Sequence, residues 1–147
     1  QADEVTFTKN ISEGLNMVAT GLNLKAGDNV VVCPDLEHPN NVYSWLNLQR
    51  NGVEVRLVKA GENAAMPVDD MIARMDAKTR CLTASTVSFA PGFRTDVEKL
   101  GRACRERGVA QIGNVFDWTE REPDVFVASA IAVVSIAVRQ YSKRTAQ

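Results

Sequence analysis

The stretch KAGDNVVVCPDLEHPNNVYSWLNLQRNGVEVRLV, residues 25–58, predicts a strand, a helix and a second strand in succession. After a Gly-Asp turn, the unbroken apolar run that ends at Cys33 is typical of a strand buried on both faces of a sheet. Residues 39–52 have helical spacing and end on Asn-Gly, and residues 53–58 form the second strand. The core-facing side of the helix is expected to consist of Val42, Trp45, Leu46 and Gln49. Since parallel neighbours need a crossover that returns the chain, this unit predicts a parallel pair.

The same alternation continues on both sides of this unit. Residues 11–22 place apolar side chains at helical spacing, and either Asn10 or Ser12 is expected to cap the start of that helix. Further along, the pattern predicts a helix, a strand and a helix, at 68–75, 79–85 and 96–108. The sequence therefore predicts an α/β fold, a mostly parallel sheet flanked by helices, with residues 1–147 forming a single domain.

Composition and charge exclude several classes of protein. The 17 basic and 18 acidic side chains are interspersed along the chain, so neither nucleic acid nor a membrane surface is an expected partner. The apolar run at 125–138 is too short for a confident membrane span. The cysteines are odd in number and lack metal-ligand spacing, which predicts buried thiols, no metal site and a reducing, cytoplasmic location. They are Cys33, Cys81 and Cys104.

Two places along the chain are candidates for ligand binding. The chain has one histidine, His38, a few residues beyond the strand end at Cys33. Ligands of parallel sheets bind outside the carboxyl ends of the strands, which favours a binding role over a packed or solvated loop histidine. The helix start at residue 11 is the second candidate, because its unpaired amides and dipole can bind a phosphate. An ordinary capped helix would have the same sequence.

Five separated motifs resemble those of the class V aminotransferase family of pyridoxal phosphate (PLP) enzymes, which includes the cysteine desulfurases and selenocysteine lyases. In chain order they are the helix start SEGLNMVA, the strand GDNV, the segment EHPNN, the tryptophan that follows, and VSFAPG. The resemblance extends over roughly residues 5–109. It implies an incomplete large domain of a fold-type-I PLP enzyme, with PLP as cofactor, a small amino acid as substrate, and a homodimer in intact relatives.

The resemblance also implies roles for individual residues. Ser12 is expected to bind the cofactor phosphate together with the backbone N–H groups of Ile11 and Ser12, which agrees with the chemistry of a helix start. His38 is expected to lie flat on the pyridine ring and to help move protons. Phe89 stands where the desulfurases have an asparagine beside the phenolic oxygen of the cofactor, so this position cannot make that hydrogen bond. None of the cysteines matches the nucleophilic cysteine of the desulfurases.

Beyond residue 108 the resemblance allows two alignments. In the first, Gln111 lies beside the cofactor, the strand with the aspartate that binds the pyridine nitrogen is missing, and Ala132 or a neighbour replaces the lysine that binds the cofactor covalently. In the second, Asp117 binds the pyridine nitrogen and Lys143 is the catalytic lysine. The simpler interpretations of these two residues are an exposed loop carboxylate and a solvated terminal lysine.

Two classes of function remain open. The first is PLP-dependent chemistry on an amino acid, either transamination or lyase- and desulfurase-type chemistry as in intact relatives, with this fragment active or inactive. The second is a non-catalytic structural or partner-binding remnant of the same fold. An unrelated nucleotide-binding domain is disfavoured, because the chain has neither a Gly-x-Gly-x-x-Gly loop nor a Walker-type loop.

Overall fold

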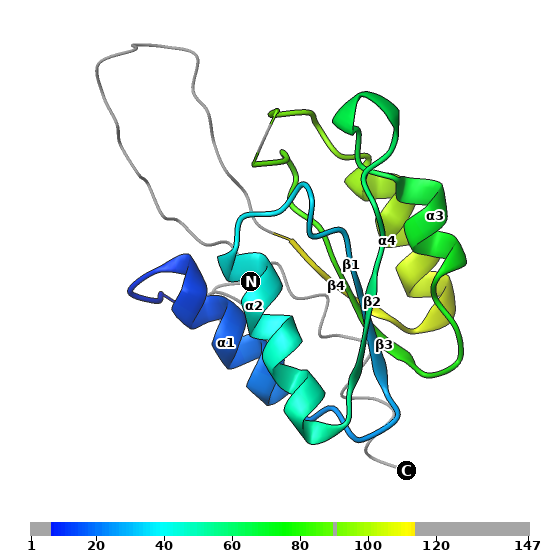
Figure 1. The fold of residues 1–147 in the computed structure, drawn as a ribbon. Helices are drawn as coiled ribbons and strands as arrows, with labels where there is room; N and C mark the ends of the chain where they lie inside the picture. Colours follow the sequence, from blue (N-terminus) through cyan, green and yellow to red (C-terminus); the bar gives the residue numbers. More distant parts are fainter. Residues whose placement is uncertain (1–6, 90, 114–147) are drawn as a thin grey trace.

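The computed structural model describes residues 7–89 and 91–113 (Figure 1). Asp117, Lys143 and the apolar run at 125–138 lie outside the described residues. The strands in the described part are β1 (Asn29–Val32), β2 (Glu54–Leu57), β3 (Thr79–Thr83) and β4 (Ala110–Ile112). The α-helices are α1 (Ile11–Gly21), α2 (Asn40–Leu46), α3 (Val68–Ala73) and α4 (Val97–Arg107), and the 3-10 turns are η2 (Asn47–Asn51) and η3 (Glu62–Ala64).

The strands form a parallel sheet in the order β2-β1-β3-β4. Helices α1 and α2 cover one face and α3 and α4 cover the other, so the sheet lies between two helical layers (Figure 1). β1 is a central strand, and its Val30 pairs with Val55 of β2 and with Cys81 of β3. The predicted α/β fold with a parallel sheet is confirmed.

Neighbouring residues of β1 point to opposite faces of the sheet, and both faces are buried. Val30 packs in the cluster beneath α1 and α2, whereas Val31 packs in the cluster beneath α3 and α4. The first cluster includes Leu15, Trp45, Cys81 and Ile112, and the second includes Met71, Leu82, Leu100 and Cys104. A central strand between two helical layers has no solvent-facing side, which explains an apolar run without alternation.

The helix ends follow from the local sequence, with one exception. The side-chain Oδ1 of Asn10 caps α1 by accepting a hydrogen bond from the backbone N–H of Glu13 at 2.9 Å. Gly108 ends α4 at a φ of 66°, a left-handed conformation that glycine adopts without strain. α2 is shorter than predicted, because the chain tightens into η2 after Leu46. With about three residues per turn the side-chain directions shift, and Gln49 is exposed instead of facing the core.

Burial determines the chemistry of the three thiols. All are free and buried, as predicted. Burial raises the pKa of the Cys33 thiol to about 11, and the charges of Asp35 and Glu37 add to this effect. Burial also raises the pKa of Cys104 to about 11 and the pKa of Cys81 well above its ordinary value. These thiols are protonated at neutral pH and are poor nucleophiles.

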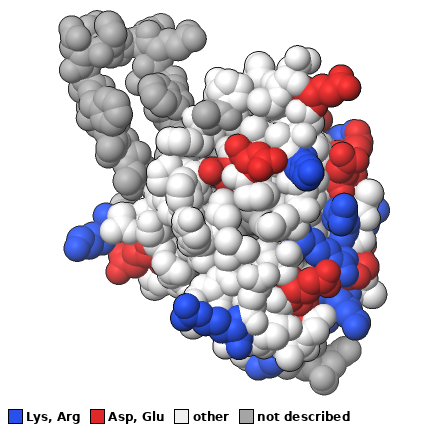
Figure 2. All heavy atoms as spheres, viewed as in Figure 1, with Lys and Arg blue, Asp and Glu red and all other residues white. Residues whose placement is uncertain are grey.

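Charged side chains of both signs lie beside one another on the surface shown in Figure 2. Arg56, for example, contacts Glu54 at 3.1 Å and Asp76 at 2.7 Å. Within residues 7–89 and 91–113, no helix has the length and apolar character needed to cross a membrane. The same residues contain no group of three His, Cys, Asp or Glu side chains that could hold a metal ion.

Candidate functional site

The loop from β1 to α2 leaves the sheet at the carboxyl ends of the strands and carries Glu37 and His38. Glu37 is buried, and its carboxylate accepts hydrogen bonds from the backbone N–H of Ser85 at 2.6 Å and from the Ser85 hydroxyl at 2.5 Å. The side-chain amide of Asn41 donates to the same carboxylate at 2.8 Å. Because Ser85 lies just after the end of β3, Glu37 joins the His38 loop to the neighbouring strand.

Asn41 extends this network into the core beneath α2. Its side-chain oxygen accepts hydrogen bonds from Nε1 of Trp45 at 3.2 Å and from the hydroxyl of Thr83 at 2.8 Å. Asn41, Trp45 and Thr83 are fully buried, so water cannot replace these partners. Buried polar groups are tolerated when each has a partner, and a complete network of this kind fixes one arrangement of its members.

His38 is half-buried and contacts Phe89 on one side and the backbone of Asn40 on the other. Its ring meets the ring of Phe89 edge to face, with the centroids 4.8 Å apart and an angle of 80° between the planes. Its Nδ1 accepts a hydrogen bond from the backbone N–H of Asn40 at 3.4 Å. The backbone N–H of Phe89 also donates to the carbonyl of Leu36 at 3.0 Å. The imidazole therefore has defined neighbours even though it is on a loop.

The first turn of α1 has the donors that suit an anion. Glu13 turns back at the helix start, where its carboxylate accepts the backbone N–H of Lys9 at 2.6 Å. The amides of Ile11 and Ser12 are in the first turn, where a helix provides no acceptor of its own. The Ser12 side chain is exposed beside them. Two amides, a hydroxyl and the positive end of the helix dipole are a donor set that fits a phosphate ester.

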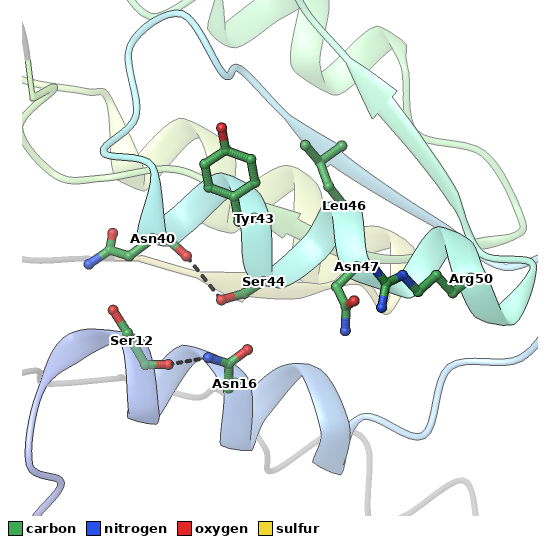
Figure 3. A pocket seen from close by; sticks show the side chains of 8 residues that line it. All are labelled: Ser12, Asn16, Asn40, Tyr43, Ser44, Leu46, Asn47 and Arg50. Carbon is green, nitrogen blue, oxygen red and sulfur yellow. Dashed lines mark hydrogen bonds between the residues drawn. The ribbon is translucent and has the colours of Figure 1, made fainter.

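A groove of about 590 Å³ lies between α1 and α2 (Figure 3). Ser12 and Asn40 face each other near one end of it, and Arg50 lies toward the other end (Figure 3). The remaining lining residues are Asn16, Tyr43, Ser44, Leu46 and Asn47. His38 does not line the groove, but Asn40 links the two, because its backbone N–H donates to the imidazole. The groove thus has the start of α1 and the residue that hydrogen-bonds His38 at one end and Arg50 toward the other (Figure 3).

The family model described as aminotransferase class-V matches residues 1–112 of the chain. The chain belongs to the class-V aminotransferase family. This membership confirms the family that the sequence motifs indicated.

Individual members of the class-V aminotransferase family show how much of such a protein the chain represents. A probable cysteine desulfurase from Methanothermobacter thermautotrophicus is 42% identical over 107 residues, which are 73% of this chain and 26% of the relative. The apo structure of a cysteine desulfurase from Thermococcus onnurineus NA1 has a TM-score of 0.70 at 26% identity, over 78% of this chain and 29% of that one. A C-DES mutant with glycine covalently linked to its PLP cofactor shares the fold, with a TM-score of 0.67 at 20% identity, over 82% and 32%. The chain spans about a quarter of the length of the curated relative.

The structure of this class-V aminotransferase chain brings no two of the predicted site residues into contact within its described part. Ser12 lines the groove between α1 and α2, whereas His38 is in the loop before α2 and is linked to the groove only through Asn40. Gln111 is in β4, and its side-chain amide donates to the carbonyl of Val97 at 3.3 Å, against α4 on the opposite face. Its predicted place beside the cofactor stays a prediction. Asp117 and Lys143 lie outside the described residues, so their roles also stay predictions.

Sequence reasoning assigned no role to Glu37, Asn41 or Ser85. Glu37 and Asn41 belong to the motif EHPNN. The position of the Glu37 carboxylate next to the apolar Leu36 is a signal that it is buried and needs hydrogen-bond donors. Ser85 had no local signal, because the residue that it binds is 48 positions away. Only the pairing of β1 with β3 brings these two positions together.

Proposed function

We propose that the chain is the cofactor-binding part of a PLP-dependent enzyme of the class-V aminotransferase family that acts on a small amino acid, by transamination or by lyase- or desulfurase-type chemistry. The observation that carries this proposal is the donor set at the first turn of α1, beside a groove whose lining residue Asn40 hydrogen-bonds the only histidine of the chain. A phosphate at one end and an aromatic ring at the other are the two features of PLP that these groups suit. Cytoplasmic location and pairing as a homodimer belong to the same proposal.

Each residue has a defined part in this proposal. The hydroxyl of Ser12 and the amides of Ile11 and Ser12 bind the phosphate, and the helix dipole stabilises its charge. His38 stacks on the pyridine ring and can hold or release a proton near the reacting carbon. When bound, PLP supplies an electron sink for the carbanion that forms when the amino acid loses a group from its α-carbon. Phe89 provides an apolar wall where the desulfurases have an asparagine.

Catalysis needs a lysine and an aspartate in addition to these groups. In the active form of the proposal Lys143 binds the cofactor covalently and Asp117 holds the proton on its pyridine nitrogen. In the alternative form Gln111 is the cofactor neighbour, Ala132 or a neighbour stands at the position of the catalytic lysine, and the chain is a non-catalytic remnant. The hydrogen bond from the Gln111 side chain to the carbonyl of Val97, on the α4 face, argues against a place for Gln111 beside PLP. It does not bear on Asp117 or Lys143, whose roles rest on the alignment alone.

The test is a titration of the full chain with PLP, followed by absorbance. We expect a band from covalently bound cofactor that Lys143→Ala abolishes and that the matched variant Lys59→Ala, at an exposed lysine, retains. Ser12→Ala should weaken binding about tenfold, as expected when one charge-assisted hydrogen bond of roughly 1.5 kcal/mol is lost. Cofactor uptake without the band would support the non-catalytic form. The absence of any uptake would contradict the proposed function.

A further inference from the structure

We propose that Glu37 and Phe89 are positioning residues that set the orientation of the His38 imidazole, a role that rests on the proposed stacking of His38 on PLP. Glu37 is adjacent to His38 in sequence, and Phe89 contacts it through space. Neither residue needs to touch the cofactor. Together they restrain the backbone and the ring plane of a histidine that would otherwise be on an unrestrained loop.

Glu37 holds the backbone that carries His38. Its side chain is 5% exposed and takes three hydrogen bonds from uncharged donors, two of Ser85 and one of Asn41. These donors come from two elements, the end of β3 and the first turn of α2. The loop is therefore tied to the central part of the sheet on one side and to the following helix on the other. A carboxylate does this better than an amide, because the backbone N–H of Ser85 and the side-chain NH₂ of Asn41 can only donate, and the Ser85 hydroxyl donates as well.

Phe89 fixes the plane of the imidazole. Although its side chain is 53% exposed, it is held by its backbone, whose N–H donates to Leu36. The segment around it is closed by the antiparallel bridge between Val87 and Arg94. The edge-to-face contact at 4.8 Å is the geometry that aromatic pairs prefer. The histidine is thus restrained from the side of Phe89 as well as through the loop backbone.

The tautomer of His38 follows from the same arrangement. The Asn40 backbone N–H donates to Nδ1, so this nitrogen is an acceptor and a neutral imidazole carries its proton on Nε2. Asn40 begins α2, and Asn41, its neighbour, is the residue that binds Glu37. A change at Glu37 therefore reaches the imidazole through the helix start as well as through the loop.

His38 is the only histidine of the 147-residue chain, so its imidazole protons give a single set of NMR signals. In Glu37→Gln one amide proton must face a donor of Ser85 or Asn41. We expect the nuclear Overhauser contacts between the His38 and Phe89 rings to be lost, with far-UV circular dichroism unchanged. The matched variant is Glu98→Gln, since the Glu98 side chain is 88% exposed, and it should keep the contacts. Phe89→Leu should shift the imidazole signals relative to the unsubstituted chain, whereas Phe89→Tyr, which keeps the aromatic ring, should leave them in place.

If the chain takes up PLP, Glu37→Gln and Phe89→Leu should each raise the Kd for PLP by about tenfold. Phe89→Tyr should have the same Kd as the unsubstituted chain. Should Glu37→Gln fail to fold, Ser85→Ala removes one donor and must shift the same imidazole signals. Unchanged His38 signals and ring contacts in folded Glu37→Gln or Ser85→Ala would overturn the proposal. The NMR measurements need no cofactor, so the two proposals can fail separately. A chain that binds no PLP contradicts the proposed function, whereas the His38 signals and ring contacts alone decide whether Glu37 and Phe89 position the imidazole.

Discussion

The substitution Asn41→Ala should be among the most destabilising changes to a polar residue of the described chain. Asn41 has no exposed surface, and its side chain joins three buried partners, the carboxylate of Glu37, Nε1 of Trp45 and the hydroxyl of Thr83. Alanine removes all three hydrogen bonds and leaves a cavity that is lined by polar groups. The effect is therefore one of lost partners and not only of lost packing.

The magnitude follows from what each partner can do afterwards. Among residues 7–89 and 91–113 the indole N–H of Trp45 has Asn41 as its acceptor, so about 1–3 kcal/mol is lost when that acceptor is removed. Glu37 loses one of its three donors, and a hydrogen bond to a charged group contributes about 1.5–3 kcal/mol. The Thr83 hydroxyl can rotate and contributes least. We expect a decrease of about 3 kcal/mol or more in the free energy of unfolding, a large share of the roughly 5–15 kcal/mol of a typical domain.

The assay is urea unfolding followed by far-UV circular dichroism at neutral pH. The matched control is Asn47→Ala, because Asn47 is exposed in the turn that continues α2, and it should change the free energy of unfolding by no more than about 0.5 kcal/mol. A decrease below about 1 kcal/mol for Asn41→Ala, close to that of the control, would refute the view that this network holds the loop.

Three further predictions concern other parts of the chain. Hydrogen bonds from Asn29, Arg56 and Lys78 hold the pKa of Asp76 well below its ordinary value. The stability that these bonds contribute is therefore fully present above the ordinary pKa of about 3.9 and is lost as the pH falls toward the lowered pKa. Asp76→Asn should therefore destabilise the protein at pH 7 and have a smaller effect near pH 3 in urea unfolding, and an equal loss at both would contradict this. The three buried thiols should react with a disulfide reagent at pH 8 only after unfolding, and reaction in the folded state at the rate of free cysteine would show that they are accessible. Gly52→Ala should destabilise by about 1 kcal/mol or more in the same urea assay, because Gly52 has a φ of 79° and an added Cβ would lie 2.9 Å from the Ala26 side chain. The control is Gly21→Ala in the last turn of α1, where the added Cβ meets nothing within 4 Å apart from its chain neighbours and the backbone of its own helix. It should stabilise by up to about 1 kcal/mol, and a change of the same sign in both variants would contradict both expectations.

Much of the fold could be predicted from local patterns because those patterns report burial directly. The run of valines before Cys33 is apolar on consecutive residues, and β1 is indeed covered on both faces. The spacing of the apolar residues in 11–22 and 96–108 corresponds to α1 and α4 within one or two residues. The end of α2 could not be predicted in the same way, since the change to η2 after Leu46 depends on how the chain returns to the sheet.

The position of the candidate site could be predicted from the sequence, but the contacts that hold its residues in place could not. A lone histidine beyond a strand end, and a polar helix start, can both be recognised along the chain because each depends on neighbours within a few residues. The face on which Gln111 lies could not be recognised, since the side-chain direction in a strand depends on the register with β3. The contact between His38 and Phe89 joins two segments that share no local pattern.

By itself, the order of apolar runs, caps and glycines determined the alternation of strands and helices, and the motifs determined the family. These properties depend on short-range sterics, hydrogen bonding of the backbone and the period of apolar residues. Only the tertiary structure decided that β1 lies between β2 and β3, and hence that Glu37 meets Ser85 and that the imidazole of His38 rests against Phe89. Such pairs form because packing the sheet brings distant strand ends to one edge, a condition that no short stretch of sequence contains.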